Sequence, residues 1–380
     1  MYSLKLPRNI VSGAGSLKEL GTAIQGKYKN VAVFSDGGII KSGIVDKVIE
    51  QLNYCGVQYE IIETATKEPT CDEAQQIIDD FNHKNFDLIV AIGGGSVMDL
   101  AKLTSVLVGS EHSVRDLLES PLLGKRTIGL MMIPTTAGTG SEATPNSIVL
   151  VPEKELKVGI VNPEMIPDFV ILDGDLIRDL PLEIAASTGI DALTHAIECY
   201  TSKLANPFSN LFAAEALKLI VHNIEKACSD KDAIDEKNNM LLAAFYAGIA
   251  ITSSGTTAVH ALSYPLGGKY KIPHGIANGM MLMPVMRFNE SACQKELVEC
   301  YDMLNLSGAK SIEEKSNIVL ERIEQIISTL AIPKTLSELN IEVDDIDQLV
   351  QSGMQVERLL KNNKRVVTAE DAKKIYQAIL

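Results

Sequence analysis

In the first half of the chain, short apolar runs alternate with stretches whose apolar residues recur at helical spacing. The apolar runs predict strands at Val31–Phe34, Gly56–Glu63, Phe86–Ile92, Thr127–Ile133 and within Ser147–Leu172. Between them, helical spacing predicts helices at Asp46–Leu52, Asp72–Phe81 and Val97–Val108. Strands that are apolar almost throughout are typical of a parallel sheet, because helices cover both of its faces. The pattern therefore predicts an α/β domain with an open parallel sheet.

After Pro181 the pattern changes to long stretches with helical spacing, and strand-like runs become scarce. These stretches predict helices at Ala185–Tyr200, Asn210–Cys228, Lys237–Ser253, Ala292–Leu304, Ile312–Leu330 and Ala369–Leu380. The last helix is preceded by Thr368, with Asp371 three residues later, a capping-box pattern that favours a helix start. We therefore expect two domains, an α/β domain over residues 1–180 and an all-α domain over residues 181–380.

Composition then excludes several classes of partner. The net charge of −14 argues against nucleic acid, because contacts to phosphates need concentrated cations. No apolar stretch approaches the roughly 20 residues of a membrane helix, and the first residues lack the features of a signal peptide. Six scattered cysteines without a Cys-x-x-Cys pair are typical of reduced thiols. We expect a cytoplasmic protein that binds neither nucleic acid nor membranes.

Two glycine-rich segments each follow a predicted strand. Gly93-Gly94-Gly95-Ser96 leads directly into a predicted helix, where a turn without side chains lets a pyrophosphate approach the backbone amides. The alternative is a tight turn that simply requires glycine conformations. The second segment, Pro134 to Glu142, offers hydroxyls and glycines to a phosphate or ribose. Asp36 ends the first strand and suits a ribose hydroxyl, although aspartate before Gly-Gly is also common in turns.

The second half contains the side chains of a transition-metal site. Asp191 and His195 are four residues apart in a predicted helix, so they share one face. With His260 and His274 they supply one carboxylate and three imidazoles, which suit Fe²⁺ or Zn²⁺. An equally good interpretation of these residues alone is that Asp191 and His195 form an ordinary pair on a helix face and that His260 is a histidine of the core. Glu198, three residues after His195, is a candidate ligand or support, but we expect an ordinary glutamate on the helix face.

Four motifs, taken in order, resemble the iron-dependent (group III) alcohol dehydrogenase family over essentially the full length of the chain. They are Gly93-Gly-Gly-Ser-Val-Met-Asp-Leu-Ala-Lys102, Pro134-Thr-Thr-Ala-Gly-Thr-Gly-Ser-Glu142, Asp191-Ala-Leu-Thr-His195-Ala-Ile-Glu, and His260 followed by Pro273-His274-Gly275. The resemblance implies a Rossmann-like dinucleotide-binding domain, an all-α metal-binding domain and a homo-oligomer, a dimer in this family. It also implies that the metal ligands are Asp191, His195, His260 and His274.

The same resemblance implies residues that contact the cofactor and the substrate. Asp36 falls at the family's adenosine-ribose carboxylate, which favours NAD over NADP, and Lys157 matches a lysine on the nicotinamide side. The pyrophosphate would lie against Gly94, Gly95, Ser96, Thr135, Thr136 and Ser141. Tyr264 replaces a family histidine that is proposed to relay protons, so it is a candidate substrate contact. Asn146 occupies a pocket-lining position and is a second candidate.

We therefore predict an NAD(H)-dependent alcohol dehydrogenase or aldehyde reductase that acts on a small alcohol or aldehyde. An Fe²⁺ ion, or Zn²⁺ in its place, would polarise the carbonyl in the cleft between the domains. Related alternatives are a glycerol-type polyol dehydrogenase and a dehydroquinate-synthase-like enzyme. More distant ones are a metal-dependent hydrolase and a non-catalytic nucleotide-binding protein. The sequence leaves open whether the substrate is ethanol, a diol, lactaldehyde, or a phosphono- or sulfo-aldehyde.

Overall fold

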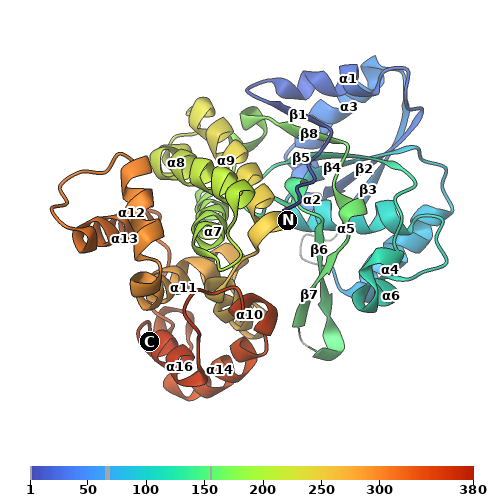
Figure 1. The fold of residues 1–380 in the computed structure, drawn as a ribbon. Helices are drawn as coiled ribbons and strands as arrows, with labels where there is room; N and C mark the ends of the chain where they lie inside the picture. The colour runs from blue at the N-terminus through green and yellow to red at the C-terminus, as the bar shows by residue number, and fades with distance from the viewer. Residues whose placement is uncertain (1, 65–68, 155) are drawn as a thin grey trace. The chain divides into compact units, whose positions relative to one another are not determined.

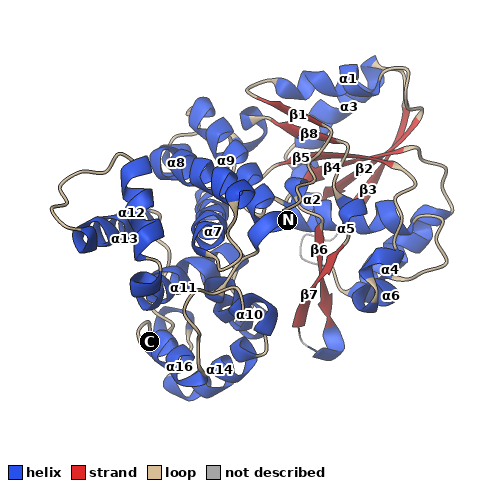
Figure 2. Cartoon of the chain, viewed as in Figure 1, coloured by secondary structure: helices blue, strands red, loops and turns tan. Residues whose placement is uncertain are grey.

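The computed structural model describes residues 2–64, 69–154 and 156–380. Figure 1 follows the chain from its N-terminus to its C-terminus. It divides into two compact units, one of residues Lys5–Asp179 and one of Leu180–Leu380 together with Met1–Leu4. All strands among the described residues belong to the first unit, as the colours of Figure 2 make clear. The change in hydrophobic pattern after Pro181 thus reflects a change from mixed to helical structure.

The first unit is built on a parallel sheet of six strands in the order β1-β8-β5-β4-β2-β3. Its strands are β1 (Asn9–Ser12), β2 (Asn30–Asp36), β3 (Gln58–Thr64), β4 (Leu88–Gly93), β5 (Gly129–Pro134) and β8 (Phe169–Leu172). An antiparallel hairpin of β6 (Asn146–Val151) and β7 (Leu156–Val161) is separate from this sheet. The predicted strands are confirmed, whereas the sequence analysis missed β1 because it is short and mostly exposed.

Helices cover both faces of the sheet. Val90 of β4 lies in a buried cluster with residues of α1 (Glu19–Ile24) and α3 (Ile44–Tyr54). Ile89 points to the opposite face, because side chains alternate along a strand, and there α5 (Gly95–Leu107) packs on the sheet. The other helices of the unit are α2 (Gly37–Lys41), α4 (Cys71–Asn82) and α6 (Val114–Glu119). This arrangement confirms the predicted Rossmann-like fold class.

The carboxyl ends of β2 and β4 form the topological switch point of the sheet. From β2 the chain continues to β3 on one side, whereas β4 is followed by β5 and β8 on the other side. Asp36 is the last residue of β2, and Gly93 is the last residue of β4, from which Gly94 leads directly into α5 at Gly95. Open α/β sheets bind ligands at such a switch point. The fold therefore brings two predicted nucleotide-binding segments to the position where a nucleotide is expected.

The described part of the second unit is entirely helical. Its helices are α7 (Leu182–Thr201), α8 (Pro207–Ser229), α9 (Ile234–Ser254), α10 (Ala258–Tyr270), α11 (His274–Asn289), α12 (Gln294–Met303), α13 (Ile312–Thr329), α14 (Ile346–Met354), α15 (Glu357–Leu360) and α16 (Ala369–Gln377). Thr368 caps α16 with Asp371 in the predicted capping box. Helices α10, α11, α14 and α15 were not predicted from the sequence. Of these, α10 and α11 contain Pro265 and Pro284 in their interiors, where proline normally disfavours a helix.

No single described helix is long and apolar enough to cross a membrane. Among the described residues, only α9 and α10 taken together meet that requirement of length and composition, and the two are bent by 108° at the break between them.

Candidate metal centre

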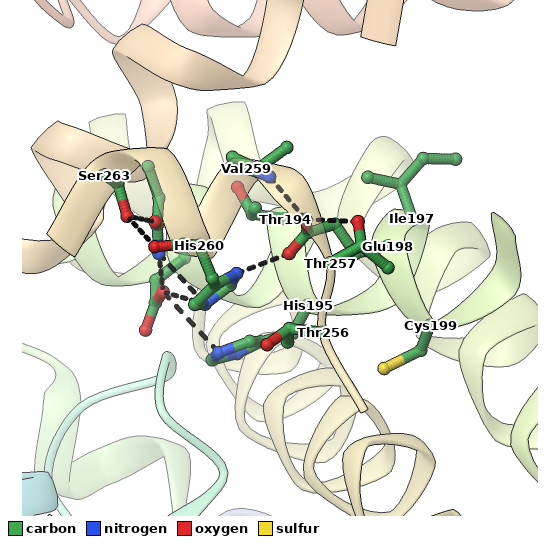
Figure 3. A network of polar contacts seen from close by, with 12 residues as sticks. Thr194, His195, Ile197, Glu198, Cys199, Thr256, Thr257, Val259, His260 and Ser263 are labelled. Carbon is green, nitrogen blue, oxygen red and sulfur yellow. Dashed lines mark hydrogen bonds and ion pairs between the residues drawn. The ribbon is translucent and has the colours of Figure 1, made fainter. Parts of the chain in front are cut away.

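Three helices of the second unit bring the four predicted metal ligands together. α7 supplies Asp191 and His195 from successive turns, α10 supplies His260 near its start, and α11 begins at His274. Figure 3 shows the imidazoles of His195 and His260 side by side, and their rings stack with centroids 4.6 Å apart. One donor atom from each of the four residues lies within 4.8 Å of every other. The structure thus unites residues that are up to 83 positions apart in the sequence (191 to 274).

The carboxylate of Asp191 lies at the middle of this group. Its Oδ1 is 3.7 Å from Nε2 of His195, 3.8 Å from Nε2 of His260 and 3.6 Å from Nε2 of His274. Donors that bind one ion tetrahedrally at about 2.0–2.2 Å lie roughly 3.4 Å from one another. The three separations from Asp191 exceed that value by only a few tenths of an ångström, and all four donors lie within 4.8 Å of one another. The donor set and its spacing therefore fit one divalent transition-metal ion.

Burial distinguishes the four side chains. Those of Asp191, His195 and His260 are 4%, 8% and 2% exposed, whereas His274 is 31% exposed. Burial alone would raise the pKa of Asp191, but the three imidazoles and the amide of Asn278 outweigh it and lower the pKa. Asp191 is therefore held as a carboxylate, the form that binds a cation. The accessible edge of the site lies at His274.

Glu198 supports the site from behind His260. It is completely buried on α7 and accepts hydrogen bonds from Oγ1 of Thr257 at 2.6 Å and from the amide of Val259 at 2.7 Å. Its Oε2 lies 2.5 Å from Nδ1 of His260 (Figure 3). The expectation of an ordinary glutamate on a helix face is therefore wrong. The start of α10 encloses this carboxylate, and helical spacing within α7 carries no signal of a partner 62 residues away.

Asn278 of α11 is a site residue that the sequence analysis missed. Its Nδ2 lies 2.8 Å from Oδ1 of Asp191, and 3.1 Å and 3.2 Å from Nε2 of His260 and His274. Its Oδ1 accepts a hydrogen bond of 2.5 Å from Ser263 of α10. One side chain thus connects all three helices of the site. Its spacing of four residues from His274 was an available signal, because such residues share a helix face.

Tyr264 lies near the accessible edge of the site. It follows His260 by one turn of α10, and its ring centroid is 6.4 Å from that of His260 and 5.8 Å from that of His274. The side chain is half-buried. The structure therefore brings this candidate substrate residue next to two predicted ligands.

In the first unit, the two glycine-rich segments lie against each other. The amide of Thr135 donates to the carbonyl of Gly93 at 3.0 Å, and a Cβ on Gly95 would approach Cγ2 of Thr139 to 2.8 Å. Gly94 precedes α5, and no side chain caps the first amides of that helix. Oγ1 of Thr135 is buried and has no hydrogen-bond partner among the described residues. Uncapped amides beside polar side chains suit an anionic ligand such as a pyrophosphate.

Ser141 and Asn146 belong to a buried cluster around Lys102. Nζ of Lys102 lies 2.6 Å from Oγ of Ser141, 2.7 Å from the carbonyl oxygen of Asn146 and 3.4 Å from Oδ1 of Asp99. Burial lowers the pKa of Lys102, although Asp99 opposes this shift. These hydrogen bonds and the ion pair link the second glycine-rich segment and the start of β6 to α5. The hydroxyl of Ser141 therefore has intramolecular partners, and its contact with a cofactor stays a prediction.

Asp36 is a capping residue in the structure. Its Oδ1 accepts hydrogen bonds from the amides of Gly38 at 2.8 Å and Ile39 at 3.1 Å, which begin α2. Asp36 thus starts a helix rather than a turn, and its contact with the ribose stays a prediction, since both of these bonds use the same oxygen. Lys157 lies on β7, opposite Leu150 of β6.

Together, these two sites define a class of protein. A glycine-rich turn at the switch point of a parallel sheet and a donor set of one aspartate and three histidines are the parts of a nucleotide-dependent oxidoreductase that uses a metal ion. A family model described as iron-containing alcohol dehydrogenase matches residues 7–174. A second, for the C-terminal part of the Fe-containing alcohol dehydrogenase family, matches residues 185–380. The chain belongs to the iron-containing alcohol dehydrogenase family.

Individual relatives agree with this family. The chain is 34% identical to long-chain-alcohol dehydrogenase 1 of Geobacillus thermodenitrificans, over 92% of this chain and 89% of the relative. It is 29% identical to the NAD-dependent methanol dehydrogenase of Bacillus methanolicus, with both chains fully covered. A crystal structure of 1,3-propanediol oxidoreductase superimposes with a TM-score of 0.93 at 26% identity, over the whole of both chains.

These similarities decide between the predicted enzyme classes. The predicted family and the prediction of a metal-dependent alcohol oxidoreductase are confirmed. The predicted cofactors, NAD(H) and iron, agree with the family and with its NAD-dependent member. The relatives named here act on alcohols, from methanol to long-chain alcohols. The hydrolase and dehydroquinate-synthase-like alternatives are disfavoured by the family match.

The approach of α11 to α7 generates a prediction for Gly275→Ala. A Cβ at this position would lie 1.9 Å from the backbone carbonyl oxygen of Ser187, which no rotamer change can relieve. We expect α11 to be displaced, so that His274 leaves Asp191 and the iron content of the purified protein falls about tenfold or more. Iron content by atomic emission and the melting temperature would be measured together.

Gly279→Ala, one turn later on the same helix, is the matched control. There a Cβ would approach side chains, those of Ile190 at 2.9 Å and Ile332 at 3.0 Å, and no backbone atom, so the iron content should stay close to that of the wild type. An unchanged iron content in the Gly275→Ala variant would show that the close approach does not position His274.

Proposed function

We propose that Asp191, His195, His260 and His274 bind one Fe²⁺ or Zn²⁺ ion, at which the protein interconverts a small alcohol and its aldehyde with NAD(H). The convergence of these four donors within 4.8 Å carries the proposal. Three imidazoles and one carboxylate suit ions of intermediate softness, whereas Mg²⁺ and Ca²⁺ prefer oxygen ligands. Membership of the iron-containing alcohol dehydrogenase family supports the same assignment.

The residues of the metal site have different proposed roles. When bound, the divalent ion polarises the carbonyl oxygen as a Lewis acid, and NADH supplies the hydride. Asp191 contributes a single negative charge, so a divalent ion at this site keeps a net positive charge. The burial of Asp191, His195 and His260 keeps water from one side of the site. The half-buried His274 leaves the other side accessible to a substrate.

For the substrate, we propose a small aliphatic alcohol or aldehyde that contacts Tyr264. The phenol of Tyr264 is a hydrogen-bond donor near the accessible edge of the metal site. There it would contact a substituent of the substrate carbonyl or take part in proton transfer. Asn146 is the second proposed contact. The names of the relatives span methanol, 1,3-propanediol and long-chain alcohols, so chain length varies within the family. Turnover of an alcohol series from methanol to octanol and of short diols, with Fe²⁺ and separately with Zn²⁺, would identify the substrate.

For the cofactor, we propose that the domain of residues 1–180 binds NAD(H) at the switch point of its sheet, while residues 181–380 hold the metal. Asp36 would accept a hydrogen bond from the adenosine ribose, and Lys157 would contact the nicotinamide side. The proposed pyrophosphate contacts are Gly94, Gly95, Ser96, Thr135, Thr136 and Ser141. The uncapped start of α5 and the position of Asp36 support this assignment.

We also propose that the protein is a cytoplasmic homodimer. All six cysteines are free in the structure, which suits a reducing compartment. The dimer follows from the family resemblance. Light scattering of the purified protein would give its mass in solution.

His274→Ala tests the metal assignment. Removing one of four ligands should lower the iron content and the turnover together by at least about tenfold, while the helices that carry the site remain folded. Iron content, the rate of NADH oxidation with an aldehyde, and the circular dichroism spectrum would be compared with the wild type. Full activity of a metal-free protein would contradict the assignment.

Asp36→Gly tests the cofactor assignment. Without the carboxylate, the ribose loses a charged hydrogen-bond acceptor and a 2′-phosphate is no longer repelled. We expect the ratio of kcat/KM for NAD to that for NADP to fall by roughly 10- to 100-fold, because such a hydrogen bond contributes about 1.5–3 kcal/mol.

Asp36→Asn is the matched control, because asparagine also caps a helix but carries no charge. It should relax the preference for NAD while keeping α2 capped. A preference that stays the same in both variants would show that Asp36 does not face the ribose.

A further inference from the structure

We propose that Glu198 is a positioning residue that selects the ring tautomer of His260 and fixes the start of α10, so that Nε2 of His260 faces the metal. This inference rests on the proposed function, because it explains how one of the four proposed ligands is oriented. It assigns a task to a fully buried carboxylate that is not itself among those ligands.

The contact between Glu198 and His260 determines where the imidazole proton lies. Oε2 of Glu198 is 2.5 Å from Nδ1 of His260 (Figure 3). As a carboxylate, Glu198 can only accept from Nδ1, so the proposal places the imidazole proton on Nδ1. A neutral imidazole has a single N–H, and Nε2 therefore keeps its lone pair. Nε2 is the nitrogen that lies 3.8 Å from Asp191, on the side of the other donors.

A contact on the opposite side of the ring is compatible with the same tautomer. Nδ2 of Asn278 lies 3.1 Å from Nε2 of His260, and it also faces Oδ1 of Asp191 at 2.8 Å and Nε2 of His274 at 3.2 Å. An amide NH₂ group only donates, so an unprotonated Nε2 can accept from it. Glu198 on α7 and Asn278 on α11 are thus both compatible with a proton on Nδ1 of His260 and a lone pair on Nε2.

Glu198 also fixes the backbone that carries His260. The amide of Val259 is in the first turn of α10, where amides have no partner within the helix. Thr257, which precedes α10, makes no capping bond to it, and its hydroxyl donates to Glu198 instead. Oε1 of Glu198 accepts from the amide of Val259 at 2.7 Å, so α7 supplies the missing cap. A negative charge at this end of a helix is favourable. One carboxylate therefore positions both the ring and the backbone of the ligand.

Glu198→Gln tests this inference with almost no change of shape. If the amide oxygen keeps the bonds from Thr257 and Val259, the amide N–H group faces Nδ1 of His260. Nδ1 must then become an acceptor, and the proton moves to Nε2, the nitrogen needed by the metal. If the amide is rotated the other way, its N–H group faces the amide N–H of Val259 at the start of α10, and neither group can accept a hydrogen bond. We expect both orientations of the glutamine amide to weaken metal binding at the site.

Two readouts that do not depend on turnover would be measured. Zn²⁺ affinity of the metal-stripped protein would be determined by competition with a chromophoric chelator, and the tautomer of His260 by ¹⁵N NMR of the metal-free, histidine-labelled protein. For Glu198→Gln we expect the affinity to fall by about 10- to 100-fold and the proton to move from Nδ1 to Nε2. Thr257→Val is the matched control. It removes one bond to the same carboxylate but spares the contact with His260, so both readouts should stay close to the wild type.

Several results would overturn the inference. One is a Glu198→Gln variant with wild-type affinity, and another is a loss of affinity with the tautomer unchanged, which would assign Glu198 a purely structural role. If that variant does not fold, the wild-type NMR spectrum still decides, because a proton on Nε2 of His260 contradicts the proposal. The His274→Ala variant distinguishes a failure of this inference from a failure of the proposed metal site. Unchanged Zn²⁺ affinity in that variant would overturn the proposed metal site itself.

Discussion

The metal centre depends on how closely α11 approaches α7. At Gly275 the two backbones leave no space for a side chain, and this contact brings His274, the neighbouring residue, to 3.6 Å from Asp191. A buried carboxylate is costly unless it is paired with charges or hydrogen bonds. Asp191 therefore gains from both groups that α11 delivers, the imidazole of His274 and the amide of Asn278. The packing of the helices and the chemistry of the site depend on the same contact.

Local patterns in the sequence predicted much of this structure, because they act over a few residues. The spacing of Asp191 and His195 placed both on one face of a helix, and the capping box of Thr368 located the start of α16. Interior prolines obscured α10 and α11. The roles of Glu198 and Asn278 arise from contacts across 62 and 87 residues, which no local pattern encodes. His260 and His274 entered the candidate set by residue type, and the order of motifs, rather than spacing, made them predicted ligands.

The two units handle charge in different ways. In the first, a dinucleotide of negative charge would meet uncapped amides and hydroxyls at the switch point of the sheet, where few cationic side chains are needed. The net charge of −14 is therefore no obstacle to the cofactor. In the second unit, the four donor side chains carry a single negative charge in total. A divalent ion bound to them would keep a net positive charge that acts on the substrate oxygen. Tyr264 lies at the accessible edge of the site, which is why we propose it as a substrate contact.

X-ray absorption at the iron edge of the Fe²⁺-loaded protein tests the central claim most directly, because it reports the atoms bound to the ion. The account predicts one ion per chain with a shell of nitrogen and oxygen donors only. It also predicts the outer-shell scattering of three imidazoles, and of two in the His274→Ala variant. A sulfur donor, an all-oxygen shell, or a spectrum unchanged by that substitution would contradict the assignment of Asp191, His195, His260 and His274 as the metal ligands.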